Sequence, residues 1–183
     1  MNTAQTVWLR PLERRHLGKT LEWANDPELM RLLNRARTVS TEEHEQWFEG
    51  LQKRDECCYF AIETADGTHI GNVWLWDIDP RHLRAELRIV MDLDHAGKGA
   101  GTEAISRLCD YAFERLNLHK VYAYVLAINP RARRSFEKAG FVLEGTLRED
   151  RWTGESFTDV YLLARHFSRK DAKAQRKTTK TSQ

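Results

Sequence analysis

The chain has 183 residues, of which 41% are apolar, and its formal net charge at pH 7 is +2. That length and apolar content are enough for one well-buried domain. No apolar run approaches the roughly 18 residues that a membrane span needs, and the N-terminus has no continuous apolar segment of the signal-peptide kind. We therefore expect a cytoplasmic protein that does not enter a membrane.

Basic residues are concentrated at the C-terminus. Residues 169–183 hold six of the 29 Lys and Arg residues but only one of the 27 Asp and Glu residues, which leaves 23 bases against 26 acids before them. A basic tail can contact nucleic acid or anionic lipid, but one with so few apolar residues is more typical of a solvated, disordered end. The prediction is one domain over residues 1–168, a disordered tail over 169–183 and no nucleic-acid partner.

The N-terminal part is predicted to form one strand followed by helices. Residues 6–12 alternate apolar and polar side chains, and Pro11 favours an edge position or a strand end. Asp26–Pro27 gives an N-cap followed by proline at the first helical position. The run STEE at residues 40–43 is a capping box that leads into a further helix.

Three strand-like runs follow, at residues 58–63, 69–77 and 84–91, and the turn-like segments ADGT and DIDPRH separate them. This spacing predicts an antiparallel meander. The glycine-rich stretch GKGAGTEA at residues 97–104 then opens a helix, and a strand at residues 120–127 follows it. A strand, a crossover helix and a second strand make a parallel unit.

A second short helix is predicted over residues 130–139 and ends at Gly140. It leads into strands near residues 141–147 and 157–164. Together the elements predict an α+β fold with a mixed, mostly antiparallel central sheet and helices packed on its faces.

The glycine-rich stretch is a candidate anion site. Gly97, Gly99 and Gly101 alternate just before a predicted helix start, where backbone N–H groups lack internal partners and the helix dipole is positive. Lys98 adds a positive charge to the same turn. The spacing GxGxG matches neither the P-loop nor the dinucleotide fingerprint, so the alternative is a strand-to-helix turn without a ligand.

The residues around this loop resemble the GNAT superfamily of acyl-CoA-dependent N-acyltransferases. The resemblance spans residues 7–163 and is specific in three places. These are the loop at residues 96–101, which aligns with the pattern (Q/R)xxGx(G/A), the strand NLHKVYAYV, and the segment NxxAxxxxEKxGF at residues 129–141. Within the superfamily the chain is similar to the branch of ribosomal-protein N-terminal, polyamine and nucleotide-linked amino-sugar acetyltransferases.

The resemblance implies acetyl-CoA as co-substrate and a sheet that splays between its fourth and fifth strands, with the thioester in the gap. Backbone N–H groups of the loop would hold the pyrophosphate, and the strand before the loop would pair with the pantetheine arm. The residues implied for this binding are Ile89, Val90, Met91, Ala96, Gly97, Lys98, Gly99, Ala100, Gly101, Thr102, Asn129, Arg133, Arg134, Phe136 and Lys138. For Arg133, Arg134 and Lys138 a solvated helix face is an equally good interpretation.

Two positions depart from the family pattern. Ala96 stands where Gln or Arg is common, which removes a side chain but leaves the backbone donors. Phe136 stands where many relatives have a tyrosine that protonates the departing thiolate. That proton would then come from water, from another residue such as Ser135, or from none. Phe136 also keeps open a different class, an acyl-CoA-binding module with little catalysis.

Acetyl transfer requires a neutral amine, whereas a lysine-like amine with a pKa near 10.4 is almost entirely protonated at pH 7. Glu86 is the candidate base. Strict alternation places it on the same strand face as Arg84 and Arg88, beside the proposed gap. The alternative is that Glu86 forms a structural ion pair with one of these arginines. Backbone N–H groups at the splay would polarise the thioester carbonyl.

Cysteine and histidine chemistry is not predicted. Cys57 and Cys58 are adjacent and Cys109 lies in a helical pattern, so all three are expected to be reduced thiols away from the gap. The seven histidines lack metal-ligand spacing, although His44 and His82 are placed where an acceptor site is conceivable. We expect direct transfer without an acyl-enzyme and without a metal.

The acceptor is expected to be a small-molecule amine or a peptide N-terminus. Residues 21–31 and 40–51 look similar to the N-terminal part of nucleotide-linked amino-sugar acetyltransferases, which makes an amino sugar the first expectation. Trp23 and Trp47 are then stacking surfaces, or simply core residues. The acidic start of residues 40–51 would instead suit a polyamine, unless these are ordinary first-turn carboxylates. A monomer or a homodimer is expected.

Overall fold

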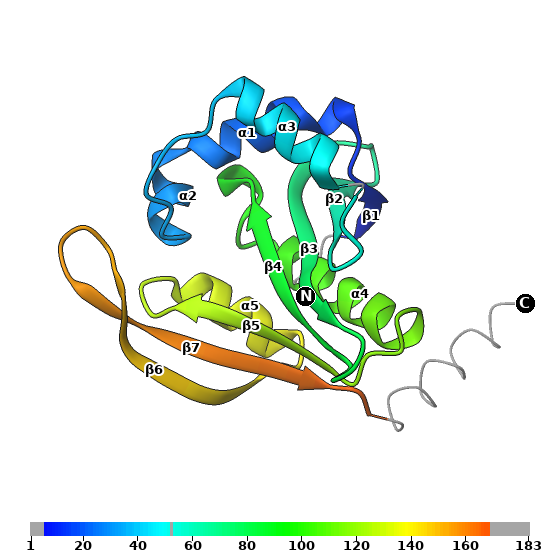
Figure 1. Cartoon of the computed structure of the whole chain (residues 1–183), viewed down its shortest axis with the longest axis vertical. Coiled ribbons are helices and arrows are strands. Elements are labelled where there is room, and N and C mark those ends of the chain that lie inside the picture. Colours follow the sequence, from blue (N-terminus) through cyan, green and yellow to red (C-terminus); the bar gives the residue numbers. More distant parts are fainter. Residues whose placement is uncertain (1–5, 52, 169–183) are drawn as a thin grey trace, which may run out of the picture.

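The computed structural model describes residues 6–51 and 53–168 (Figure 1). Its seven strands form one sheet in the order β1–β2–β3–β4–β5–β7–β6. The strands are β1 (Val7–Pro11), β2 (Cys58–Thr64), β3 (His69–Asp79), β4 (Arg84–Met91), β5 (Lys120–Leu126), β6 (Val142–Trp152) and β7 (Phe157–His166). The helices are α1 (Leu17–Asn25), α2 (Pro27–Leu32), α3 (Thr41–Leu51), α4 (Ala100–Glu114) and α5 (Pro130–Lys138), with 3-10 turns η1 (Arg14–His16) and η2 (Leu93–His95).

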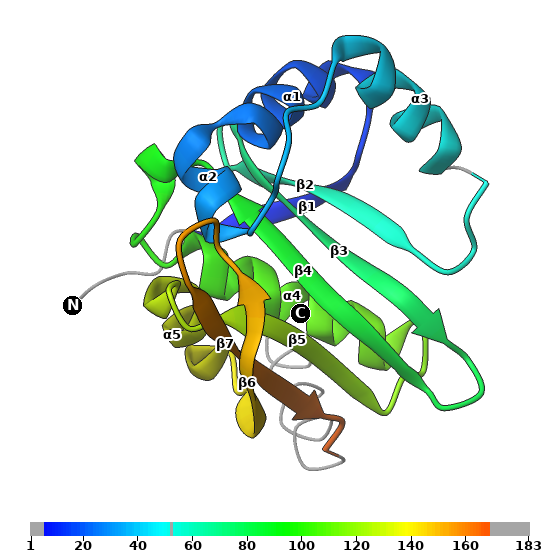
Figure 2. The ribbon, with the colours of Figure 1, turned by 60° about the vertical axis from the view of Figure 1, so that its left-hand side comes forward.

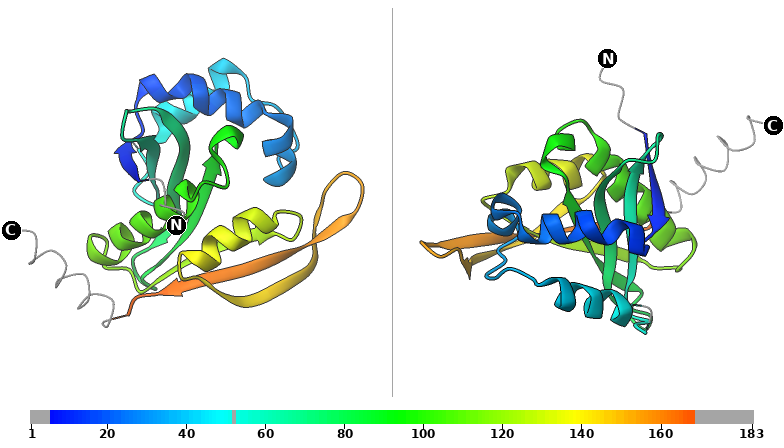
Figure 3. Two further views of the ribbon diagram at one scale, coloured as in Figure 1. Left: turned by 180° about the vertical axis from the view of Figure 1, so that it is seen from behind. Right: turned by 90° about the horizontal axis from the view of Figure 1, so that it is seen from above.

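The fold confirms the predicted α+β class. Every neighbouring pair of strands is antiparallel except β4 and β5, which are parallel as the crossover helix α4 requires. Helices α1, α2 and α3 gather on one side of the first four strands, and α4 lies on the other side (Figure 2). Seen from behind, α4 and α5 lie in front of the sheet (Figure 3). No helix among the described residues is long and apolar enough to span a membrane.

The helix starts follow from local capping chemistry. The Asp26 side chain accepts a hydrogen bond from the Leu29 N–H at 2.8 Å at the start of α2. At α3 the Ser40 hydroxyl accepts from the Glu43 N–H at 3.2 Å, while the Glu43 carboxylate accepts from the Ser40 N–H at 3.0 Å. This reciprocal pair confirms the predicted capping box.

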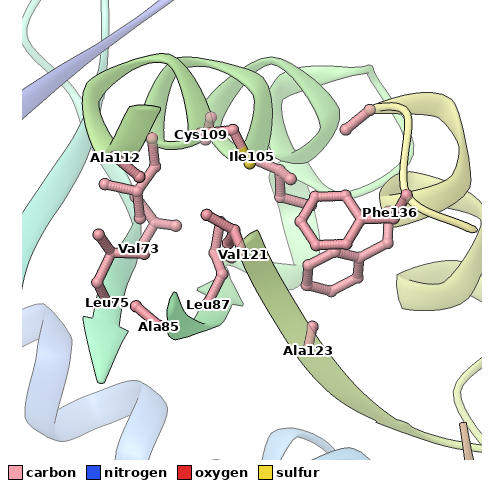
Figure 4. Close-up of a cluster of buried hydrophobic side chains, with 14 of the residues drawn as sticks. Val73, Leu75, Ala85, Leu87, Ile105, Cys109, Ala112, Val121, Ala123 and Phe136 are labelled. Atoms are coloured by element: carbon pink, nitrogen blue, oxygen red, sulfur yellow. The ribbon is translucent and has the colours of Figure 1, made fainter. Parts of the chain in front are cut away.

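The main core lies between the sheet and α4 (Figure 4). Alternation along β4 sends Ala85 and Leu87 into this core, where both are almost completely buried, and turns Glu86 to the opposite face. A smaller cluster of Trp23, Leu29, Trp74 and Val90 packs on that opposite face, under α1 and α2. One face of β4 therefore packs against α4, and the other carries Glu86 beside a smaller apolar cluster.

The sheet splays where predicted. Pairing between β4 and β5 is confined to three residue pairs, from Arg84 with Lys120 to Glu86 with Tyr122. Beyond Glu86, β4 continues to Met91 without a strand partner on the side of β5. The gap between the fourth and fifth strands therefore exposes main-chain groups of β4.

Strands β6 and β7 run further than the sequence pattern indicates, to residues 152 and 166. Residues 148–152 (REDRW) show no apolar alternation, yet they form strand because main-chain pairing with β7 holds them across a register shift. The tip of this hairpin projects towards α2 (Figure 1). The basic tail lies outside the described residues, and the domain boundary at residue 168 stays a prediction.

Candidate active site

The glycine loop turns the chain from β4 into α4 with a left-handed backbone. Gly97 has a φ of +82° and Gly99 a φ of +89°, values that favour glycine. Gly99 is the N-cap of α4, and no side chain caps this helix end. The first N–H groups of α4 are therefore left for another acceptor, at the positive end of a 15-residue helix. This is the geometry of an anion site.

A cavity of about 340 Å³ opens between this loop, the end of β4, α2 and α5. The strand face, the loop and the helix that the sequence places in the cofactor site are thus brought together. The predicted residues that line the cavity are Ile89, Val90, Met91, Ala96, Gly97, Gly99, Gly101, Thr102, Asn129, Arg134, Ser135, Phe136 and Lys138.

Three predicted residues do not line it. The Lys98 ammonium donates to the Asp94 carbonyl oxygen at 2.9 Å, and Ala100 is completely buried beneath the loop. Arg133 pairs with Glu137 at 2.8 Å, and its guanidinium carbon lies 4.4 Å from the centre of the Tyr161 ring. Asp94 precedes the glycine loop, Glu137 lies one helical turn from Arg133 in α5, and Tyr161 lies in β7, so Lys98 and Arg133 are held by contacts away from the cavity.

Sequence reasoning missed Arg131, which lines the cavity from the first turn of α5. The run NPRARR was the available signal, but it does not indicate which of its arginines face inwards. With Arg134 and Lys138, Arg131 makes the lining cationic, and no acidic residue of the described chain lines this cavity. Apolar side chains of α2, which the sequence also did not reveal, close the other wall. The cavity suits an elongated ligand with anionic and apolar parts.

Glu86 lies at the last paired position before the splay and is 8% exposed. Both of its carboxylate oxygens accept from Arg88, at 2.7 Å from Nε and 2.8 Å from Nη2. Arg84 turns instead towards Asp79, with 3.9 Å between Nε and the carboxylate. The ion-pair alternative is thus realised with Arg88, at a position that still borders the gap.

A second cavity, of about 430 Å³, lies on the Glu86 side of the gap. It shares six lining residues with the first cavity, so the two meet at the splay; these are Leu32, Leu33, Ile89, Asn129, Ala132 and Phe136. Its other polar lining residues are Asn34, Arg35, Glu86, Arg88, Tyr124 and Arg151. Both cavities have cationic side chains, and among the described residues only the second also contains a carboxylate, that of Glu86.

Proton donors near the gap are few. The Ser135 hydroxyl donates to the Arg131 carbonyl oxygen at 3.2 Å and lines the first cavity. Phe136 is 3% exposed and packs edge-on against Phe141, so it is a core residue that also forms part of both linings. Tyr124, which sequence reasoning did not consider, lines the second cavity with 48% of its surface exposed.

The cysteines are thiols away from both cavities. Burial raises the pKa of Cys58 to about 11 and that of Cys109 to about 12, so neither is a ready nucleophile. His82 forms an exposed ion pair with Asp79 and lines neither cavity, whereas His44 is a buried residue of α3. Within residues 6–51 and 53–168 no group of three or more His, Cys, Asp or Glu residues is placed to hold a metal.

The two tryptophans have different surroundings. Trp23 is 4% exposed in the smaller cluster, which favours its core interpretation. Trp47 is half-buried and stacks on His44, with ring centres 4.9 Å apart. Both line a third cavity, of about 450 Å³, between α1, α3 and the sheet.

Comparison with known proteins places this geometry in a family. Residues 6–142 match the model of the acetyltransferase (GNAT) domain. Spermidine N(1)-acetyltransferase of Vibrio cholerae is 33% identical over 170 residues, covering 87% of this chain and 91% of that enzyme. A crystal structure of the Vibrio cholerae enzyme with CoA and spermine superposes with a TM-score of 0.83 at 32% identity, covering 87% of this chain and 95% of that one.

A further structure of the Vibrio cholerae enzyme is described as dodecameric, with a TM-score of 0.76 at 32% identity over 87% of this chain and 93% of that one. The expectation of a monomer or homodimer thus gains no support. These relatives are spermidine acetyltransferases, which supports the polyamine alternative. They give no support to the expectation of an amino-sugar acceptor. The match over residues 6–142 and the shared architecture show that the chain belongs to the GNAT acetyltransferase family and is an acetyl-CoA-dependent N-acetyltransferase.

Proposed function

We propose that the chain moves the acetyl group of acetyl-CoA to a primary amine by direct attack at the splay between β4 and β5. The observation that carries this proposal is the meeting of two unlike cavities at the end of β4. The first, whose described lining has cationic residues and no acidic one, suits the co-substrate, and the second, which contains Glu86, suits the amine. Neither a cysteine nucleophile nor a metal is required for this chemistry.

The co-substrate is held mainly by main-chain groups. The free N–H groups at the start of α4 bind the pyrophosphate, with Arg131, Arg134 and Lys138 supplying positive charge around it. Unpaired main-chain groups of β4 beyond Glu86 receive the amides of the pantetheine arm. Ala96 has no charged side chain, and in this proposal the main-chain N–H groups and the three cationic side chains bind the pyrophosphate without one.

Glu86 is the proposed general base. The amine nitrogen forms a bond to the acetyl carbonyl carbon, the carbon–sulfur bond breaks, and the amine proton passes to the Glu86 carboxylate directly or through one water. The sulfur leaves as a thiolate that takes a proton from water, either directly or through the Ser135 hydroxyl, which receives a proton from that water in turn. Arg88 holds both Glu86 oxygens, so the carboxylate is fixed in orientation at the gap. Positioning of amine and thioester supplies much of the acceleration.

The test is thiol release from acetyl-CoA with a panel of amines that contains spermidine, a nucleotide-linked amino sugar and short peptides. Spermidine heads the panel because the relatives are spermidine acetyltransferases. Amine-dependent release supports the proposed reaction. CoA binding with no release for any amine of the panel would refute the proposed transfer to these acceptors.

A cytoplasmic location and the oligomeric state remain predictions. Cell fractionation checks the first. Sedimentation of the full chain checks whether it is a monomer, a homodimer or a larger assembly like the dodecamer of its relative.

A further inference from the structure

The second cavity, which is the proposed amine site, has more positively than negatively charged side chains. Three arginines and one carboxylate line the second cavity, namely Arg35, Arg88, Arg151 and Glu86. Arg88 and Glu86 neutralise each other through two hydrogen bonds. Arg151 is paired with its neighbour Asp150. Arg35 has no ion-pair partner among the described residues, so the cavity carries a net positive charge.

Arg35 also lines the third cavity, between α1, α3 and the sheet. It is lined by Arg35, Arg37 and Glu43, and the Glu43 carboxylate accepts from Arg37 at 2.9 and 3.0 Å. Arg35 and Trp74 line both the second and the third cavity. In each cavity every lining carboxylate is bound to another arginine, which leaves the Arg35 guanidinium as the charge available to a ligand.

Trp74 is a second side chain that lines both of these cavities, and its indole N–H is unpaired among the described residues. It is 8% exposed, and its indole N–H has no hydrogen-bond acceptor within the described part of the chain. An indole N–H only donates, and a buried donor without a partner costs free energy. Because this indole nitrogen is closed off from solvent, the group that a ligand can reach is the unpaired Arg35 guanidinium, which calls for hydrogen-bond acceptors, preferably anionic ones.

We propose, resting on the proposed acetyl transfer, that the acceptor is an amine that also carries a carboxylate or a phosphate, and that Arg35 binds this anionic group while the amine lies at Glu86. Volumes of about 430 and 450 Å³ fall in the range of small-molecule sites. A polyamine is a polycation near neutral pH and would face the Arg35 charge without a free carboxylate to bind it. The substrate class is thus predicted to differ from that of the polyamine relatives.

The experiment compares amines of different charge in the thiol-release assay, and three of them, 4-aminobutanoate, O-phosphoethanolamine and butylamine, are of similar length. The acceptors are 4-aminobutanoate, O-phosphoethanolamine, a nucleotide-linked amino sugar, butylamine and spermidine. The expected order of kcat/KM has the anionic amines first, then butylamine, then spermidine. The carboxylate and phosphate arms show which anion the site prefers.

Arg35→Gln separates binding of the anion from chemistry. It is expected to lower kcat/KM for the preferred anionic amine about tenfold or more, mainly through KM, because one charge-assisted interaction is lost. The change for butylamine should be much smaller, because butylamine has no anionic group for Arg35 to bind, and Arg35→Lys should restore part of the loss for the anionic amine. Arg31→Gln is the matched control, since Arg31 is an exposed arginine of α2 that pairs with Glu28.

Preferential acetylation of spermidine, or an Arg35→Gln variant with unchanged kinetics towards anionic amines, would overturn this inference and leave the proposed transfer intact. Absence of thiol release with every amine would instead overturn the proposed transfer. Circular dichroism of each variant confirms that it is folded.

Discussion

Alanine substitutions at two glycines can separate an effect on folding from an effect on CoA binding. Gly97 and Gly67 have nearly the same φ, at +82° and +83°, and a Cβ added at either meets no atom within 4 Å. Gly97 lies in the proposed pyrophosphate loop, whereas Gly67 lies in the turn between β2 and β3. The pair therefore carries the same backbone strain at two sites with different proposed roles.

Alanine at either position is forced into the left-handed region, which costs about 1–2 kcal/mol. For a chain of this size about 1 kcal/mol lowers Tm by roughly 2–4 °C. Gly67→Ala and Gly97→Ala should therefore lose similar stability. Only Gly97→Ala also places a methyl group where the backbone has to approach the pyrophosphate. The loss of one charge-assisted hydrogen bond there weakens CoA binding about tenfold to a hundredfold.

Thermal unfolding gives the stability of both variants, and isothermal titration with CoA gives the affinity. Wild-type affinity in Gly67→Ala combined with at least tenfold weaker binding in Gly97→Ala supports the loop as the pyrophosphate site. Equal CoA affinity in the two variants would refute it, because the only difference between them is the place of the methyl group.

Three further predictions concern the base, a buried histidine and a helix cap. Glu86→Gln should lower kcat by about 10²–10⁴-fold and remove the acidic limb of the pH–rate profile while sparing CoA affinity. The surface variant Glu28→Gln, which loses a comparable arginine pair, should behave as wild type, and an unchanged profile in Glu86→Gln would rule out the base. Burial lowers the pKa of His44 below its usual value, so the unfolded chain binds more protons as the pH falls below about 6.5. Stability should therefore decline on acidification in urea titrations, and a His44→Phe variant that declines as steeply would contradict the assignment. Asp26→Ala removes the 2.8 Å cap of α2 and should cost about 1 kcal/mol of unfolding free energy. Urea midpoints measure this, and no change would show that the cap contributes nothing.

The sequence alone determined those features that depend on neighbours along the chain. Capping at Asp26 and the Ser40–Glu43 box join residues three apart, so their signals survive without knowledge of the fold. Alternation along β4 likewise assigned Glu86 to the face opposite the core, because the strand period is two. The glycine loop and the family resemblance together placed the splay between the fourth and fifth strands.

Only the tertiary structure decided which side chains meet across the gap. The sequence offered both Arg84 and Arg88 as partners of Glu86, and the fold selected Arg88 while Asp79 drew Arg84 away. It also turned Arg133 towards Tyr161, a contact between α5 and β7 that no local pattern encodes.

The positive charge of the second cavity also depends on the tertiary structure. Arg35 follows α2, Arg88 lies in β4 and Arg151 lies in β6, and these three segments are far apart in the sequence. They face one cavity because sheet order and the hairpin register bring them together. Composition and motif spacing contain no information on such long-range contacts. The acetyl donor could therefore be predicted from the sequence, whereas the charge around the acceptor could not.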